Sequence, residues 1–264
     1  SALTFSSLAR TGVGSVNFAG EGLGASDNRN RILFTTAPVA DNAVIGPWAL
    51  YNGTNLASYT AAQGVISASD SVFTDLSAKG PSVIPNDAAA LARINSEGSE
   101  GGISLAADTG TSVGLIMQAS GWDAAVGLTN GQALKTSSLI VGAGTAALTL
   151  GTNTADGLLM PLTGGGALTI ANYSDAAVLT VNTPVTSNGT ASTLVKLGSG
   201  QVRLNGAVSH AGATQLAEGE LVFAANSLTQ SLVGVISGNG RLVQQGSGRL
   251  TLVAANTYNG ETVV

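Results

Sequence analysis

The sequence contains no cysteine, so it can form neither a disulfide framework nor a cysteine-ligated metal site. Histidine occurs once, at His210, which excludes any metal site that needs two histidine ligands. Charged residues make up only 9% of the chain, against about a quarter in a typical soluble domain. Lys and Arg are scattered singly and the net charge is −5, so neither nucleic acid nor an anionic membrane surface is an expected partner.

Long apolar runs are also missing. No segment approaches the roughly 20 apolar residues that a membrane-spanning helix needs, so we expect no membrane insertion. Hydrophobic residues still make up 44% of the chain, which provides enough apolar surface to bury and excludes a disordered protein. The chain stops at Val264 within a strand-like pattern, and we expect it to be a fragment of a longer repetitive chain.

Short alternating segments and 36 glycines dominate what remains. Each such segment alternates apolar with polar residues and is bounded by Gly, Asn or Ser, which predicts short β-strands. The clearest of them are Ala147–Leu150, Ala167–Ile170, Val178–Val181, Gln201–Leu204 and Arg249–Leu252. Asn-Gly and Asp-Gly pairs, which favour tight turns, recur at Asn52, Asn130, Asp156, Asn188, Asn205, Asn239 and Asn259.

The chain also repeats itself. The stretch that begins at Leu194 recurs without a gap from Leu242. A sandwich has no reason to repeat at that interval, whereas a solenoid must stack equivalent coils. We therefore predict an all-β parallel β-solenoid with coils of roughly 24 residues, half the repeat. The recurring pairs are Gly198 with Gly246, Gly200 with Gly248, Leu204 with Leu252, Gly212 with Gly260, and Thr214 with Thr262.

One segment has a different pattern. Asn86–Ser96, "NDAAALARINS", is rich in alanine and predicts a short helix capped by Asn86 or Asp87. We place it as an insertion on the side of the solenoid, within less regular coils that run from about residue 38 to residue 102. On this interpretation residues 1–264 form a single module, whose best-defined repeats lie at 194–264.

The final segment, "GVISGNGRLVQQGSGRLTLVAANTYNGETVV", resembles the passenger-associated repeat of bacterial autotransporters. Leu3–Gly20 and Ile45–Ser67 resemble other segments of very large surface β-helix proteins. The resemblance implies a right-handed parallel β-helix that is secreted or attached to the outer membrane at the bacterial surface. The positions that match the motif include Gly246, Gly248, Leu250, Leu252, Asn256, Tyr258, Gly260 and Thr262.

Catalytic patterns are few. Gly110–Gly114 matches the nucleophile elbow G-x-S-x-G around Ser112, and Asp123 and His210 follow in hydrolase order. That motif requires a strand–turn–helix setting, and the surrounding sequence does not alternate strands with helices. Since His210 aligns with Tyr258 in the repeat, we interpret it as a surface or corner residue. We predict no catalytic residue, no metal and no cofactor.

A carbohydrate-active β-helix enzyme is the leading alternative. Its carboxylates would come from the densest charge clusters, around Asp27 and Glu97, because glycosidases need two carboxylates about 5–10 Å apart. Two further patterns could bind sugar or an ordered surface, although packing and ordinary β-propensity explain both. They are the aromatics Trp48, Tyr51, Tyr59 and Trp122, and the outward threonines Thr149, Thr169, Thr180 and Thr251.

The sequence thus favours a structural and adhesive module of an extracellular fibre or stalk over an enzyme. Stacked coils would form a stiff rod with a repetitive outer face. Its partners would be flanking β-helix modules or identical subunits stacked head to tail, with surface glycans or other cells as possible contacts of the outer face.

Overall fold

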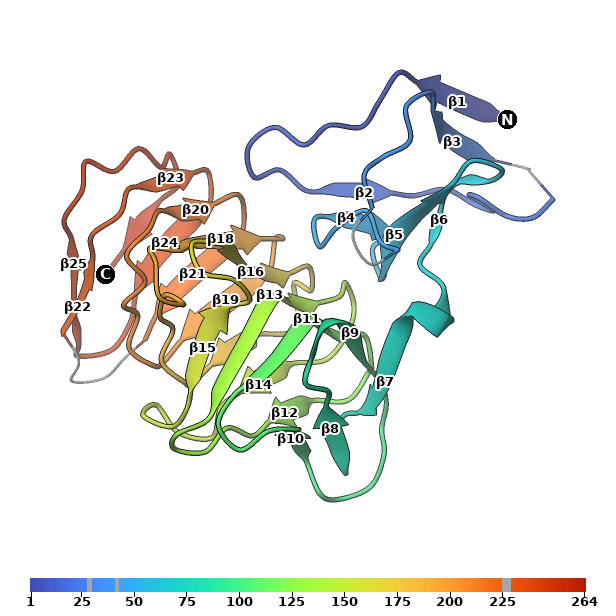
Figure 1. Ribbon diagram of the computed structural model, residues 1–264. Coiled ribbons are helices and arrows are strands. Elements are labelled where there is room, and N and C mark those ends of the chain that lie inside the picture. Colours follow the sequence, from blue (N-terminus) through green and yellow to red (C-terminus); the bar gives the residue numbers. More distant parts are fainter. Residues whose placement is uncertain (28–29, 41–42, 225–228) are drawn as a thin grey trace. The chain divides into compact units, whose positions relative to one another are not determined.

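The computed structural model describes residues 1–27, 30–40, 43–224 and 229–264 (Figure 1). Strands are the dominant element throughout, and a short 3₁₀ turn covers Asp70–Val72. No helix in these four ranges is long and apolar enough to cross a membrane. The chain divides into two compact units, Ser1–Phe73 and Thr74–Val264, whereas the sequence analysis treats residues 1–264 as one module.

The first unit combines parallel and antiparallel pairs. β1 (Ala2–Phe5) pairs in parallel with β3 (Arg31–Phe34). β2 (Val16–Phe18), β4 (Ala49–Tyr51), β5 (Asn55–Thr60) and β6 (Gly64–Ser67) form a four-stranded sheet in which β4, β5 and β6 run antiparallel. The turn between the antiparallel strands β4 and β5 includes Asn52 and Gly53, whose φ angles are 49° and 76°. Asn and Gly are the residues that adopt such positive φ angles in hairpin turns. This unit therefore contains a hairpin, not only coils.

The second unit is a parallel β-solenoid of about eight turns. Each coil passes through sheet 1, then sheet 2, then a third face, and successive strands stack in parallel along the axis (Figure 1). In spatial order sheet 1 contains β23 (Ile236–Gly238), β20 (Thr214–Leu216), β18 (Thr193–Leu197), β16 (Ala167–Asn172), β13 (Ala133–Val141), β11 (Thr111–Gln118), β9 (Asp87–Ser96) and β7 (Phe73–Ser77).

Sheet 2 and the third face complete each coil. Sheet 2 contains β26 (Thr262–Val263), β24 (Arg241–Gln244), β21 (Glu220–Phe223), β19 (Gln201–Leu204), β17 (Leu179–Val181), β14 (Leu148–Leu150), β12 (Ala124–Val126), β10 (Ile103–Leu105) and β8 (Ser82–Ile84). The third face is narrower and contains β15 (Leu158–Pro161), the bridging residues Val185 and Val208, and the pair β22 (Thr229–Leu232) and β25 (Arg249–Leu252). All five strands expected from the alternating segments are confirmed.

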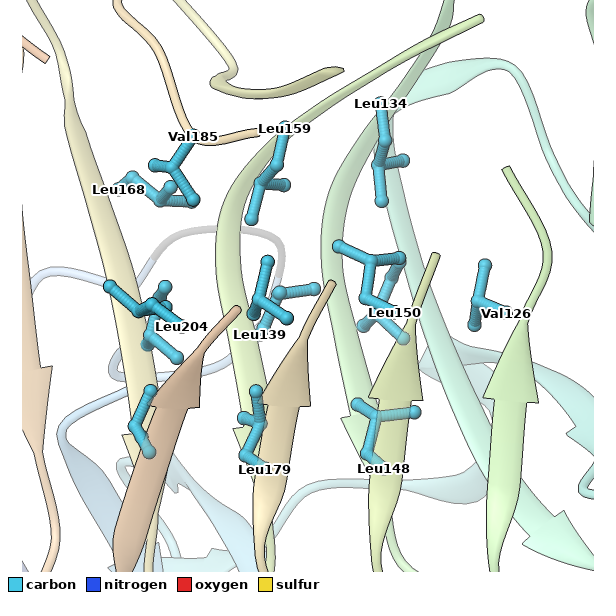
Figure 2. Packing of buried hydrophobic residues seen from close by; sticks show 14 of the residues in the cluster. Val126, Leu134, Leu139, Leu148, Leu150, Leu159, Leu168, Leu179, Val185 and Leu204 are labelled. Carbon is cyan, nitrogen blue, oxygen red and sulfur yellow. The ribbon is translucent and has the colours of Figure 1, made fainter. Parts of the chain in front are cut away.

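The core consists of inward side chains stacked from coil to coil (Figure 2). In sheet 2, Leu148 pairs with Leu179, and Leu150 pairs with Val181, which in turn pairs with Leu204. All five are at most 1% exposed. Because parallel register places each inward residue on the one before, columns of Leu, Ile and Val fill the interior, and aromatic rings are scarce there.

The predicted helix at Asn86–Ser96 is wrong. Asp87–Ser96 is strand β9, which lies between β7 and β11 in sheet 1 and places Ala92 and Ile94 in the core. Alanine favours helix only weakly on its own. Pairing with strands on both sides satisfies the backbone of β9, and burial of its apolar side chains outweighs that local preference.

The sequence repeat does not correspond to a whole number of coils, because coils vary in length. Leu204 reaches its partner Phe223 after a short coil, whereas Leu150 reaches its partner Val181 after a much longer one. Two coils on from Leu194 the chain is at Ile236, short of Leu242, where the repeat begins again. The repeat therefore does not span two whole coils, although coils of 19 and 31 residues lie on either side of the expected length of roughly 24.

Instead, the second copy of the repeat begins one face later in the coil than the first copy does: the first begins in sheet 1 and the second in sheet 2. Gly198 follows β18 and marks the corner from sheet 1 to sheet 2, while Gly246 follows β24 and marks the corner from sheet 2 to the third face. Both glycines have positive φ, 79° and 96°. What recurs is thus a strand, a Gly-Ser-Gly corner and a second strand, and this unit serves at either corner because both demand the same sharp bend.

Glycines also allow the coils to approach each other where sheet 1 begins. A Cβ added to Gly234 would lie 2.0 Å from the carbonyl oxygen of Gly212, one coil away. We expect Gly234→Ala to lower the free energy of unfolding by about 1–3 kcal/mol, because the backbones must separate. Urea unfolding would measure this, with Gly121→Ala as control, since a Cβ at Gly121 meets nothing within 4 Å. Equal stability of the two variants would contradict the close packing.

Candidate functional site

The hydrolase-like pattern is not assembled. Ser112 lies in β11, and its backbone N–H donates to Oδ1 of Asn86 at 2.8 Å. The residue is part of a long strand and not of a strand–turn–helix elbow. His210 lies four residues before the start of β20, which is four strands away from β11 in sheet 1, or about 19 Å at the usual strand spacing. Ser112 and His210 therefore cannot act on the same atom.

The carboxylates considered for sugar cleavage are also separate. Glu97 pairs with Lys79 at 2.7 Å on the solenoid, whereas Asp27 belongs to the other unit. Among residues 1–27, 30–40, 43–224 and 229–264, no cluster of three or more His, Asp or Glu side chains is arranged to hold a metal ion.

Three of the four aromatics share one core, whereas Trp122 belongs to the second unit and is 42% exposed. Trp48, Tyr51 and Tyr59 pack against the core of the first unit, whose centre includes Phe18 and Phe34. The hydroxyl of Tyr51 donates to the carbonyl of Leu23 at 2.5 Å. These contacts agree with a packing role for the three aromatics.

The four threonines do not form one ladder. Thr149 and Thr180 are direct partners in sheet 2. Thr169, however, is buried in sheet 1, and Thr251 lies in β25 on the third face. Thr169 lies between Leu168 and Ile170, which point into the core, so it faces outward as expected, although it is buried there.

His210 is buried, so the expectation of a surface residue is wrong, but it lies at a corner, between Val208 on the third face and β20 in sheet 1. Only 3% of the residue is accessible, and its Nε2 lies 2.8 Å from the hydroxyl of Thr214. In the second copy of the repeat, the hydroxyl of Tyr258 contacts that of Thr262 in the same way. Burial lowers the pKa of His210 to about 4, so the ring is neutral at pH 7. The two copies therefore share a contact between a polar ring, His210 or Tyr258, and the hydroxyl of the threonine four residues later.

The corner between sheets 1 and 2 contains buried polar side chains that the sequence analysis missed. Gln118 is fully buried, and its Nε2 donates to the carbonyls of Trp122 and Ala147 at 2.8 and 3.1 Å. Asn172, also fully buried, donates from Nδ2 to the carbonyls of Ala177 and Gln201 at 2.8 and 2.7 Å. Each side chain thereby forms hydrogen bonds between one coil and the next at the corner, where strand pairing does not supply them.

Lys196 is the most unusual residue of this corner. It pairs with Ile170 on one side and Leu216 on the other, so it occupies a core position and is 1% exposed. Its Nζ donates to the carbonyls of Leu197, Gly198 and Glu218 at 2.9, 2.6 and 3.2 Å. Three acceptors match the three N–H bonds of an ammonium group. The sequence does carry a signal, because Lys196 has the same alternation phase as the inward Leu194.

Burial lowers the pKa of Lys196 to about 7, although the carboxylates of Glu218 and Glu220 oppose the shift. The charged form is therefore costly in the folded chain and is tolerated because the corner carbonyls and these acids face it. Lys196 joins two coils through hydrogen bonds to their carbonyl groups. Because its pKa is near neutral, the charge of the group that makes these bonds depends on pH.

The last described coil covers residues 249–264. A cavity of about 420 Å³ opens there, and Leu250 and Leu252 lie only partly buried against the core. Val264 is 99% exposed. In the core of the unit the equivalent apolar positions are covered by another coil. The lining of this cavity comprises Leu242, Gln244, Gly248, Arg249, Leu250, Leu252, Thr262 and Val264.

Two segments of the chain, residues 194–223 and 242–264, match the model of the passenger-associated-transport-repeat family. The two matched segments cover about a fifth of the chain. This match confirms the resemblance to autotransporter passenger repeats that Gly246–Thr262 suggested, and the family implies export to the bacterial surface. No curated protein and no solved structure matches the chain.

The two matched segments contribute most of the features above. The first supplies the buried Lys196 and His210, and the second supplies the last described coil. Because the repeats begin on different sheets, Lys196 points into the core from sheet 1, whereas Gln244 at the corresponding position lies in sheet 2 and donates to the carbonyl of Gly248 at 2.8 Å.

Lys196 should make stability depend on pH. The folded pKa is about 7 and the ordinary value is 10.5, so between these pH values the unfolded chain binds the additional proton. The free energy of unfolding should then rise with pH, by at most about 1.4 kcal/mol per unit. Lys196→Met should remove this slope in urea unfolding from pH 6 to 10, while Lys135→Met, at a partly exposed position of β13, should keep it. Identical slopes in all three proteins would contradict the assignment.

His210 should act in the acidic range. Its folded pKa of about 4 lies below the ordinary 6.5, so the unfolded chain binds more protons between these values and stability falls as the pH is lowered through them. His210→Leu should lose less stability than the parent chain between pH 6.5 and 4, by up to about 1.4 kcal/mol per unit. No other histidine titrates in this range, so parallel curves would show that the ring is not buried in solution.

Proposed function

We propose that the chain is a structural and adhesive module of an extracellular β-helical fibre or surface stalk, attached to the bacterial outer membrane. The parallel stacking of one coil on the next in the second unit, together with the match to the passenger-associated-transport repeat, carries this proposal. β25 and β26 are the terminal strands of the described third face and sheet 2, and the apolar side chains of Leu250 and Leu252 are only partly covered. An uncovered strand edge with apolar lining is a template for another strand.

Stacking of further coils is the geometry that fits this edge. The solenoid grows by parallel pairing, so each new coil would satisfy the backbone groups of the one before. Such a coil would come from a flanking β-helix module or from an identical subunit. Head-to-tail contacts that do not close into a ring produce a filament.

Adhesion would use the outer faces of the same coils. Charges are few, so the surface offers repeated small polar groups in place of one strong site. Many weak contacts along a rod can raise avidity by about 10²–10⁴, which suits attachment to surface glycans or to other cells. The two passenger-associated-transport repeats support the surface location.

The stacking proposal is testable with one charge at the edge of the last described coil. Val264→Lys places a lysine at a 99% exposed position beside the free edge, where a charge opposes strand addition. We expect the parent chain to form larger species as concentration rises in analytical ultracentrifugation, and Val264→Lys to shift this onset at least several-fold higher. Val39→Lys adds the same charge at a 90% exposed valine of the other unit and should assemble like the parent.

Two results would contradict the proposal. The parent chain could remain monomeric at every concentration, with no elongated particles in electron micrographs. Alternatively, the Val264→Lys and Val39→Lys variants could assemble equally, which would place the contacts elsewhere.

A further inference from the structure

Asn-Gly pairs occur six times in the chain, at Asn52, Asn130, Asn188, Asn205, Asn239 and Asn259. Such a pair can deamidate without an enzyme, because glycine has no side chain to shield its backbone nitrogen from the neighbouring amide. That nitrogen attacks Cγ of the asparagine, so the reaction needs a nitrogen and a side-chain amide that are both free to move. The structure distinguishes the six pairs by the hydrogen bonds that hold these two groups.

Two pairs, Asn52–Gly53 and Asn239–Gly240, have the attacking nitrogen engaged. The N–H of Gly53 donates to Oδ1 of Asn17 at 2.7 Å. The N–H of Gly240 donates to the carbonyl oxygen of Leu216 at 2.9 Å. Each of these bonds must break before the nitrogen can approach Cγ.

Three other pairs have the side-chain amide engaged instead. In each of them Nδ2 donates to an oxygen atom of the preceding coil: Asn188 to the carbonyl of Pro161 at 3.2 Å, Asn205 to Oδ1 of Asn182 at 2.8 Å, and Asn259 to Oδ1 of Asn239 at 3.2 Å. The need to break one ordinary hydrogen bond slows the reaction about fivefold.

Asn130 is the exception. It lies with Gly131 at the centre of the turn that joins β12 to β13, and both residues are exposed. The N–H of Gln132 closes this turn by donating to the carbonyl of Thr129 at 3.1 Å, and Gly131 has a φ of 87°. The closing bond uses neither group of the Asn-Gly pair. Within the described ranges of the chain, the side-chain amide of Asn130 and the N–H of Gly131 have no hydrogen-bond partner.

We propose that Asn130 is a site of spontaneous deamidation, with water as the only co-reactant. The nitrogen of Gly131 loses its proton to the solvent and forms a bond to Cγ of Asn130, and the side-chain nitrogen leaves as ammonia. Water then opens the resulting succinimide at either carbonyl, which leaves aspartate or isoaspartate. In sum, one amide and one water molecule give one carboxylate and one ammonium ion.

The product places a new negative charge on the outer surface of the solenoid, in a chain whose net charge is −5. The turn is anchored on both sides, because Leu128 is fully buried and the carbonyl of Gln132 accepts from the N–H of Leu158 in the next coil at 2.9 Å. We therefore expect the coil to persist after the change, so that the modification marks the surface of the folded protein. The site does not depend on the proposed stacking.

The test compares the six pairs within one protein. The folded chain is incubated at mildly alkaline pH, and peptide mapping by mass spectrometry follows asparagine, aspartate and isoaspartate at every pair over time. The same chain in concentrated urea is the reference in which structure protects none of the pairs. We expect Asn130 to react at least about fivefold faster than any other pair in the folded chain, and the six rates to converge in urea.

Two variants sharpen the assignment. Asn17→Ala removes the acceptor of the Gly53 N–H at an exposed position of β2, so it should raise the rate at Asn52 and leave the rate at Asn130 unchanged. Asn130→Gln should abolish the leading product, because the longer amide closes its ring far more slowly.

A lead of Asn130 that disappears in urea supports the inference. Equal rates at all six pairs in the folded chain would overturn it, as would a different pair reacting first. If Asn130 leads by the same factor in urea, the flanking sequence sets the order and the inference is again overturned. An unchanged rate at Asn52 in Asn17→Ala would contradict the protection by hydrogen bonds on which the inference rests.

Discussion

Parallel pairing of each coil with the next, in register, is the interaction on which the second unit depends. It satisfies the backbone along the axis and at the same time fixes which side chains meet. The column of Leu148, Leu179 and Val202 exists because every strand of sheet 2 repeats the alternation phase of its neighbour. A coil has few interactions of its own, so its stability derives from the coils beside it.

Corners pose the opposite problem, because there the backbone bends away from the sheets and its carbonyls lose their partners. Buried side chains inside the turn supply the missing partners, because each donates hydrogen bonds to several of these carbonyls. They are Gln118, Asn172 and Lys196. Burying these groups would be costly without such bonds. The corner therefore combines two constraints, glycines that allow the bend and polar side chains that satisfy it.

Charged groups have a related role at the surface. The ion pairs of Arg93 and Arg241 connect consecutive coils. Arg93 is buried, whereas Arg241 is partly exposed, and exposed pairs contribute little stability. Their value lies in matching one strand edge to another. A solenoid needs such matching at its ends, since all strand edges offer the same backbone groups. The proposed stacking of coils is thus compatible with the match to passenger-associated-transport repeats.

Local pattern determined a large part of this protein. The alternation in Gln201–Leu204, the positive-φ glycines such as Gly198 and the repeat itself were sufficient to predict parallel coils, because period and turn chemistry are properties of short segments. Only tertiary structure decided that Asp87–Ser96 is a strand, since neighbours on both sides outweigh its helical preference. Tertiary structure also placed equivalent glycines on different corners, because coil lengths vary, and it buried His210 and Lys196, whose environments are made by other coils.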